Sequence, residues 1–197
     1  MKHIFLFALS CLALSFPTFA QEKKGSSAPE VGAKEYKQMV DRSVEYLRVR
    51  GQKSDGSFSP EAGVGPTGLV TAGLLDVGVS PADPMVQKAL DFLKKHIQPD
   101  GGIYVPGSQH RNYDTCISLM ALNRANKDGS LKSVIANAEK FVRGIQWDET
   151  ESIDGSNMSF GGAGYGSKSR PDLSNTSFLI DTLNPLGAGP DDEIKKR

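Results

Sequence analysis

The side chains best suited to chemistry gather in one short stretch, Tyr113-Asp114-Thr115-Cys116. Asp114 carries a carboxyl group that could donate a proton, and Cys116 carries a thiol that could act as a nucleophile. No serine, histidine and aspartate in the chain form a pattern typical of nucleophilic catalysis. The residues alone therefore predict that Asp114 caps its helix and that Cys116 is a small buried apolar residue.

This stretch heads one of three similar segments, each of which begins with threonine. The segments are Thr67–Leu75, Thr115–Leu122 and Thr176–Leu183, and their closing leucines lie 47 and 61 positions apart. Each segment follows an amphipathic stretch and a turn that contains glutamine and glycine. This period is typical of an array of helical hairpins with one longer loop.

The amphipathic stretches and the Thr-headed segments predict two kinds of helix. Residues 36–49, 86–97 and 134–145 place apolar side chains at helical spacing, with charged residues on the other side. These are expected to be half-exposed outer helices. The first two Thr-headed segments carry no charge, so we expect inner helices that are buried on most sides.

The turns between the helices also repeat. Residues 52–58 begin with glutamine, contain Asp-Gly and end in an aromatic residue, and residues 98–104 repeat this order. In the third unit Gln146 opens a longer Gly-rich stretch that reaches Tyr165. Asp-Gly favours a turn with positive φ, and the glutamine amide is expected to bond carbonyl groups at the helix end.

The N-terminus has the pattern of a secretory signal. Residues 1–20 contain a basic start, an apolar run and small residues before Gln21, which predicts cleavage and export to the periplasm or the medium. Residues 21–34 are polar and are expected to be a flexible lead-in, followed by one domain over 35–197. No later stretch has the ~20 apolar residues of a membrane span.

The charge composition limits the classes of binding partner that the chain is expected to have. The 197 residues contain 23 basic and 23 acidic residues without a basic stripe, which argues against nucleic acid or an anionic membrane surface. After signal cleavage Cys116 is the one remaining cysteine, so no internal disulfide is expected.

With its helix pairs, Gln and Gly turns and Thr-headed apolar helices, the chain resembles the repeat of squalene and other terpene cyclases and of protein prenyltransferase β subunits. The resemblance covers roughly residues 36–197, and 161–176 is its most family-like part. It implies an all-α fold, a partial α/α toroid of about three helix-pair repeats.

The cyclase branch of the resemblance implies a catalytic acid at the middle of an Asp-x-Asp-Asp-Thr motif. Aligned on Thr115, the chain has Tyr113 in the place of the acid and keeps only the last aspartate, Asp114. Aligned on Thr176, it has Ser174 there. A phenol does not protonate an alkene, so the chain is not expected to cyclise terpenes alone, and Asp114 remains the one catalytic candidate.

The prenyltransferase branch implies zinc bound by an Asp-x-Cys pair and a later histidine. Asp114 and Cys116 match the pair, but Asn175 stands where the histidine should be. Zinc sites use three or four protein ligands, so we expect no metal and no cofactor.

We therefore expect an exported, non-catalytic module whose concave face binds an apolar ligand or a protein segment, with Tyr113, Asp114, Cys116 and Asn175 as candidate cavity residues. The alternative is an enzyme of terpenoid cyclase type, or a fragment of one. Residues 189–197 resemble the opening of a fourth unit cut short, which predicts that the third helix pair meets solvent. The chain is therefore expected either to be a fragment or to pair through this open end with itself or with another chain.

Overall fold

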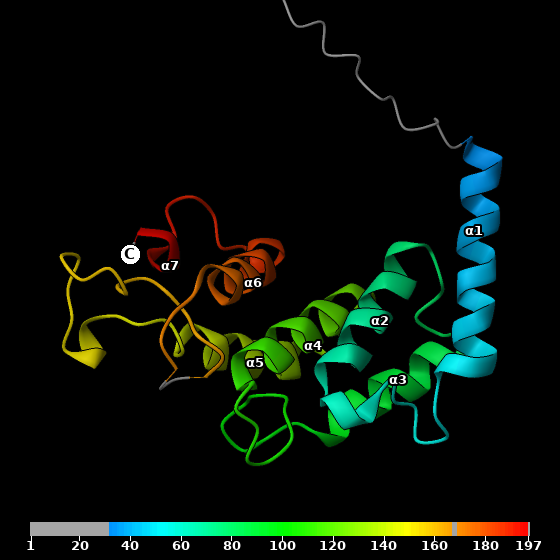
Figure 1. The fold of residues 1–197 in the computed structure, drawn as a ribbon, viewed down its shortest axis with the longest axis horizontal. Helices are drawn as coiled ribbons and strands as arrows, with labels where there is room; N and C mark the ends of the chain where they lie inside the picture. Colours follow the sequence, from blue (N-terminus) through cyan, green and yellow to red (C-terminus); the bar gives the residue numbers. More distant parts are fainter. Residues whose placement is uncertain (1–31, 167–168, 197) are drawn as a thin grey trace, which may run out of the picture.

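The computed structural model describes residues 32–166 and 169–196. Within these ranges the protein consists of helices and turns, with a single antiparallel bridge between Ile97 and Ile103, so the predicted all-α class is confirmed (Figure 1). The predicted signal peptide and residues 21–31 of the lead-in lie outside the described residues. No helix in the described part of the chain combines the length and apolar character that crossing a membrane requires.

The helix pairs have nearly their predicted bounds. The outer helices are α1 (Ala33–Tyr46), which a π-helical turn extends over Leu47–Gly51, α3 (Pro84–Lys95) and α5 (Lys132–Arg143). The inner helices are α2 (Gly65–Asp76), α4 (Arg111–Ala125) and α6 (Leu173–Leu183). Short 3-10 helices span Pro60–Ala62, Glu149–Glu151 and Asn184–Leu186, and α7 (Glu193–Lys196) follows.

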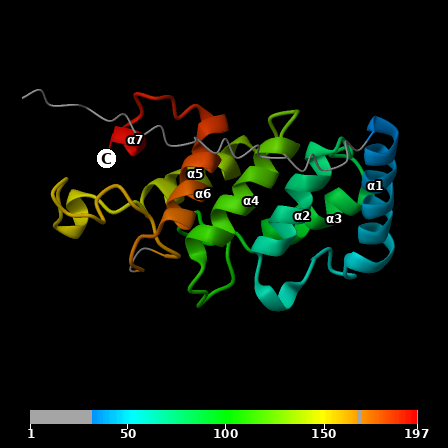
Figure 2. The same ribbon diagram turned by 45° about the horizontal axis from the view of Figure 1, so that its top comes forward.

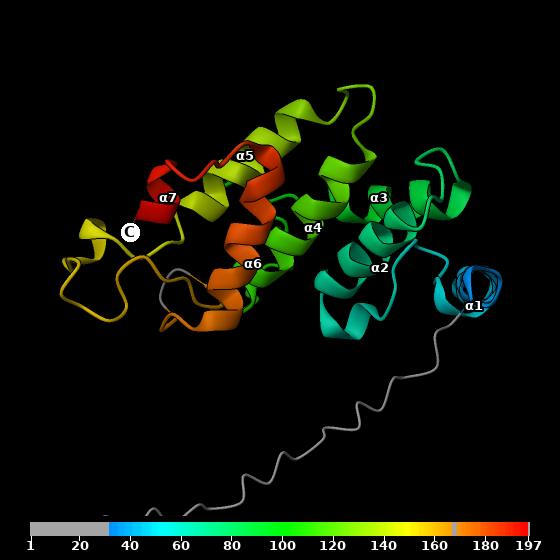
Figure 3. The same cartoon turned by 90° about the horizontal axis from the view of Figure 1, so that it is seen from above.

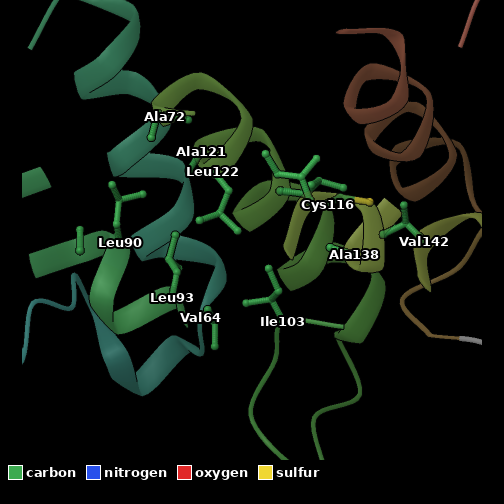
Figure 4. Close-up of a cluster of buried hydrophobic side chains, with 14 of the residues drawn as sticks. Val64, Ala72, Leu90, Leu93, Ile103, Cys116, Ala121, Leu122, Ala138 and Val142 are labelled. Carbon is green, nitrogen blue, oxygen red and sulfur yellow. The ribbon is translucent and has the colours of Figure 1, made fainter. Parts of the chain in front are cut away.

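The inner helices lie side by side in the order α2, α4, α6, and α3 and α5 cover them from one side (Figures 1 and 3). Gly68 of α2 faces the backbone of α4, where a Cβ atom would lie 3.0 Å from the Ser118 nitrogen. The core fills the space between the two layers (Figure 4). Its fully buried members include Leu93, Ile103, Leu119, Leu122, Val142 and Leu179.

One junction between successive outer helices occurs twice. Arg48 pairs in bidentate fashion with Asp83, the N-cap of α3, at 2.9 and 3.0 Å, and the Gln52 amide donates to Met85 O at 2.8 Å. At the end of α5, Arg143 pairs with Asp192 at 2.8 and 3.0 Å, and Gln146 donates to Ile194 O at 2.7 Å. The start of α3 is held against the end of α1, and the start of α7 is held in the same way against the end of α5.

These junctions change the expected picture of the third helix pair. Ala188 and Ile194 are buried, so residues 184–196 fold back over part of α5 and α6. The predicted solvent-exposed end is therefore partly covered by the chain itself.

Part of the exposed apolar surface lies at the other end of the array. Helix α1 has no buried residue and stands at a steep angle at the edge of the molecule (Figures 1 and 2). It covers only part of α2, where Leu69 is 56% exposed and Val77 is 43% exposed. Half of the α2 residues are buried, so the expected burial on most sides holds for α2 except at Leu69, Gly73 and Asp76.

The repeated Asp-Gly turns lie against the next outer helix. Gly56 and Gly101 have φ values of +94° and +90°. A Cβ atom on Gly56 would meet the carbonyl oxygen of Lys88 in α3, and one on Gly101 would lie 2.6 Å from the carbonyl oxygen of Asn137 in α5. Both the backbone conformation and the close approach therefore require glycine.

A pair of alanine substitutions separates these two requirements. Gly101→Ala is expected to lower the free energy of unfolding by at least about 1 kcal/mol more than Gly129→Ala, because only Gly101 has the backbone of α5 within reach. Gly129 is a matched control: it also follows aspartate, has a φ of +79°, and would place a Cβ atom where no neighbour lies within 4 Å. Urea denaturation measures the free energy of unfolding of both variants. Equal losses of stability would contradict the close approach of Gly101 to the backbone of α5.

Candidate functional site

The three repeated threonines share one structural role at the heads of the inner helices. Each hydroxyl oxygen accepts a hydrogen bond from the N–H of a buried residue in the preceding loop. The pairs are Phe58 to Thr67 at 2.9 Å, Ile103 to Thr115 at 3.0 Å and Ala163 to Thr176 at 2.9 Å. The threonines that head the three repeated segments therefore hold the preceding loops against the inner helices.

Asp114 caps a neighbouring helix. Its Oδ1 accepts the N–H of Gly65, the first residue of α2, at 2.9 Å, and its Oδ2 accepts the Ser108 hydroxyl at 3.4 Å. The predicted cap on its own helix is wrong, because α4 begins at Arg111 with His110 as N-cap, and this places Asp114 one turn into the helix beside α2. A Cβ atom on Gly65 would lie 2.9 Å from Oδ1, so the close approach depends on glycine.

The environment of Asp114 favours its protonated form. The carboxyl is almost fully buried, and this burial raises its pKa above the ordinary range. The hydrogen bonds from Gly65 and Ser108 act in the opposite direction and are the smaller effects. Both oxygens are engaged inside the protein.

Cys116 is a buried apolar residue, as expected. Its thiol donates to Asn112 Oδ1 at 3.1 Å, and its carbonyl oxygen accepts the Thr182 hydroxyl of α6 at 3.4 Å. Burial raises the pKa of the thiol to about 12. The sulfur is therefore protonated at neutral pH and a poor nucleophile or metal ligand.

The structure does not bring the three positions implied by the zinc-site resemblance into one site. Asp114 bonds to α2, whereas Cys116 lies at the contact with α6. Asn175 is buried at the head of α6, where its Nδ2 donates to Asp172 Oδ2 at 2.7 Å. Among the residues that the structure describes, no three His, Cys, Asp or Glu side chains are grouped so that they could hold a metal ion.

Tyr113 is the one candidate residue that reaches the surface, as part of an aromatic cluster. Its ring meets that of Phe178 in α6 edge to face, with centroids 5.1 Å apart, and lies 6.4 Å from Tyr165. His110 meets Tyr165 at 5.0 Å, also edge to face. We call His110, Tyr113, Tyr165 and Phe178 the aromatic cluster.

Leu69 of α2 is a further exposed apolar side chain. Gly65 lies against the Tyr113 ring, since a Cβ atom there would be 3.3 Å from it, and Leu69 follows one helical turn later on α2. Leu69 and Tyr165 are both more than two-fifths exposed. We call Leu69 together with the aromatic cluster the inner face.

The sequence did not single out Phe178, His110 or Leu69 as residues of the site. Phe178 and Leu69 fall inside apolar segments that read as buried, and Tyr165 reads as part of a turn. Tyr165 and Phe178 belong to the following unit, so no local spacing in the chain indicates that their rings meet Tyr113.

Comparison with known proteins adds no relative: the chain matches no protein-family model, no curated protein and no solved structure.

Asp114 and Asp172 are expected to respond to pH in opposite ways. The raised pKa of Asp114 means that its contribution to stability is present below the unfolded pKa of about 4 and is lost as the pH rises through the folded value. Asp114→Asn keeps an acceptor for Gly65 and stays neutral. Relative to the unmodified protein, this variant should gain stability between about pH 4 and pH 7.

Asp172→Asn serves as the matched comparison. The N–H of Asn175 holds the pKa of Asp172 below its ordinary range, so the stabilisation is present at neutral pH and is lost as the pH falls through the folded value. This variant should lose stability relative to the unmodified protein as the pH rises. Urea denaturation at about pH 4 and about pH 7 measures the stability of each variant relative to the unmodified protein. If this relative stability changed in the same direction with pH for both variants, the proposed environments of Asp114 and Asp172 would be contradicted.

The thiol of Cys116 should be unreactive in the folded protein. With a pKa near 12, its thiolate fraction at about pH 8 is roughly a thousandfold below that of an unfolded cysteine. A disulfide reagent should therefore modify a Cys11→Ser variant rapidly in urea and very slowly without it. Similar rates would show that the sulfur is accessible.

Proposed function

We propose that this chain is an exported, non-catalytic binding module that holds an apolar protein segment on its inner face. The observation that carries the proposal is the aromatic cluster, in which rings from α4, α6 and the intervening loop meet at an exposed surface. Rings arranged edge to face leave other ring edges and faces for a partner's side chains, and each such contact contributes about 0.5–1.5 kcal/mol beyond the area it buries.

The openness of the inner face favours a protein segment over a small apolar molecule. Tyr165 and Leu69 are 43% and 56% exposed, at separate points along this surface. Small ligands are usually held in clefts that bury most of their surface. A segment with several apolar side chains contacts separated points at once.

The repeated contacts support the further inference that the helix pairs are part of an α/α toroid of the squalene cyclase and prenyltransferase type. The threonine bond recurs in all three units, and the Arg, Asp and Gln junction recurs between outer helices. Such recurrence is expected of stacked repeats that place each neighbour in the same way.

One observation favours the alternative, a terpenoid cyclase-type enzyme. Asp114 is a buried carboxyl group whose raised pKa favours the protonated form, which is what a catalytic acid requires. However, both of its oxygens bond to protein groups, and the side chain is only 3% exposed. An alkene would have to reach that proton directly, so binding without catalysis accounts better for the geometry.

A comparison of two alanine variants tests the binding function. The immobilised chain is exposed to cell-envelope proteins and, separately, to a lipid extract, and bound species are identified by mass spectrometry. A protein that binds the unmodified chain should be lost with Tyr113→Ala, since this change removes the centre of the aromatic cluster. It should be retained with Val49→Ala, a control that removes an exposed apolar side chain from the π-helical turn after α1.

Three outcomes would contradict the proposal. Binding that is insensitive to Tyr113→Ala would place the partner elsewhere on the molecule. Recovery of a lipid alone would replace the protein segment with a small apolar ligand. Conversion of squalene that Asp114→Asn abolishes would establish the enzymatic alternative.

A further inference from the structure

A groove between α1 and α2 lies apart from the aromatic cluster and is almost wholly apolar. The hollow has a volume of about 290 Å³ and is lined by one side of α1, by Val70, Gly73 and Leu74 of α2, and by Val77 just after α2. Ser43 and Tyr36 bring the only side-chain hydroxyls to its lining. The groove is therefore an apolar space that solvent can enter.

Two observations show that the two helices leave this space unfilled. Tyr36 and Met39 of α1 line the groove and are still 59% and 50% exposed. Gly73 of α2 faces it, and a Cβ atom there would meet nothing within 4 Å. Since apolar surfaces in contact with water are unfavourable, an apolar occupant would stabilise this end of the molecule.

The size of the groove indicates an alkyl chain. A dry apolar cavity of about 150 Å³ holds one benzene molecule, so a hollow of about twice that volume accommodates roughly ten to twelve carbons. The elongated contact along successive turns of α1 suits a linear chain. A stable protein partner would need a much larger surface, on the order of 800 Å².

A second hollow next to the groove supplies a charge. It shares Met39, Ser43 and Leu47 with the groove and is also lined by Arg42 and Tyr46. Arg42 is the basic residue in the lining of this hollow and forms no ion pair within the described part of the chain, whereas Lys37 and Arg48 are paired with carboxylates. The Nε of Arg42 donates to Gln38 O at 3.2 Å, and the guanidinium has further N–H groups that can bind an anion.

We propose that the α1–α2 groove binds the alkyl chain of an aliphatic carboxylate of about ten to twelve carbons, whose carboxylate group pairs with Arg42. The tail fills the space over Gly73, and the head group lies in the hollow beside Tyr46. The site contains none of the residues of the aromatic cluster. This proposal can therefore be tested independently of the function proposed for the inner face.

Calorimetric titration of the full chain with decanoate and with decanol, both below the concentrations at which they aggregate, tests the site. One decanoate should bind per chain. Arg42→Gln should weaken decanoate binding by about tenfold, the size of one lost charged hydrogen bond, and should leave decanol binding unchanged. Arg50→Gln is the control, because this basic residue lies outside both hollows and should change neither affinity.

Gly73→Leu fills the groove from α2 and should abolish binding of both ligands. The substitution replaces glycine within a helix and so favours folding, and circular dichroism checks that the helix content is kept. Gly73→Ala is a smaller change that should weaken the binding of both ligands. It serves as the test if leucine at this position disturbs the fold. Unchanged binding in these variants, or an Arg42→Gln effect equal for decanoate and decanol, would overturn the proposal. So would sedimentation of a dimer that binds no decanoate, because a second copy would then cover the groove.

Discussion

The hydrogen bond from a loop N–H to the threonine at the head of each inner helix is the interaction on which the rest of the structure depends. Phe58, Ile103 and Ala163 are buried, and a buried N–H without a partner costs about 1–3 kcal/mol. The threonine hydroxyl removes this cost and fixes where each loop ends. In the first two units the loop in turn places its glycine against the next outer helix, so this bond helps to set the spacing of the array.

The junction between outer helices shows how the fold tolerates a change in length. Arg48 and Gln52 are separated by one residue more than Arg143 and Gln146, yet both pairs make the same contacts with the following helix. The π-helical turn over residues 47–51 accommodates the extra residue, with the Gln52 N–H bonded to Leu47 O. A π turn of this kind is a local insertion that leaves the flanking contacts in register.

The inner helices divide their side chains between packing and recognition. Asp114 and Cys116 are two positions apart on α4 and so point toward different neighbours, where each is enclosed by a helix interface. Tyr113 points toward the open side and meets rings from the next unit. The same stretch therefore contributes a cap, a core residue and a surface aromatic group. In contrast, α1 has no buried residue, and its apolar side remains open beside Gly73.

The sequence by itself determined the all-α class, the three helix pairs and their bounds to within a few residues, because helical periodicity and turn residues are local properties of the chain. It also indicated that Cys116 is a buried apolar residue, since a lone cysteine in an uncharged helical segment has few other roles. Only the tertiary structure decided that Asp114 caps α2, that Phe178 and Tyr165 meet Tyr113, and that the exposed apolar end lies at α1. Each of these depends on how helices from different repeats approach one another, and residues far apart in the chain carry no spacing that reports such contacts.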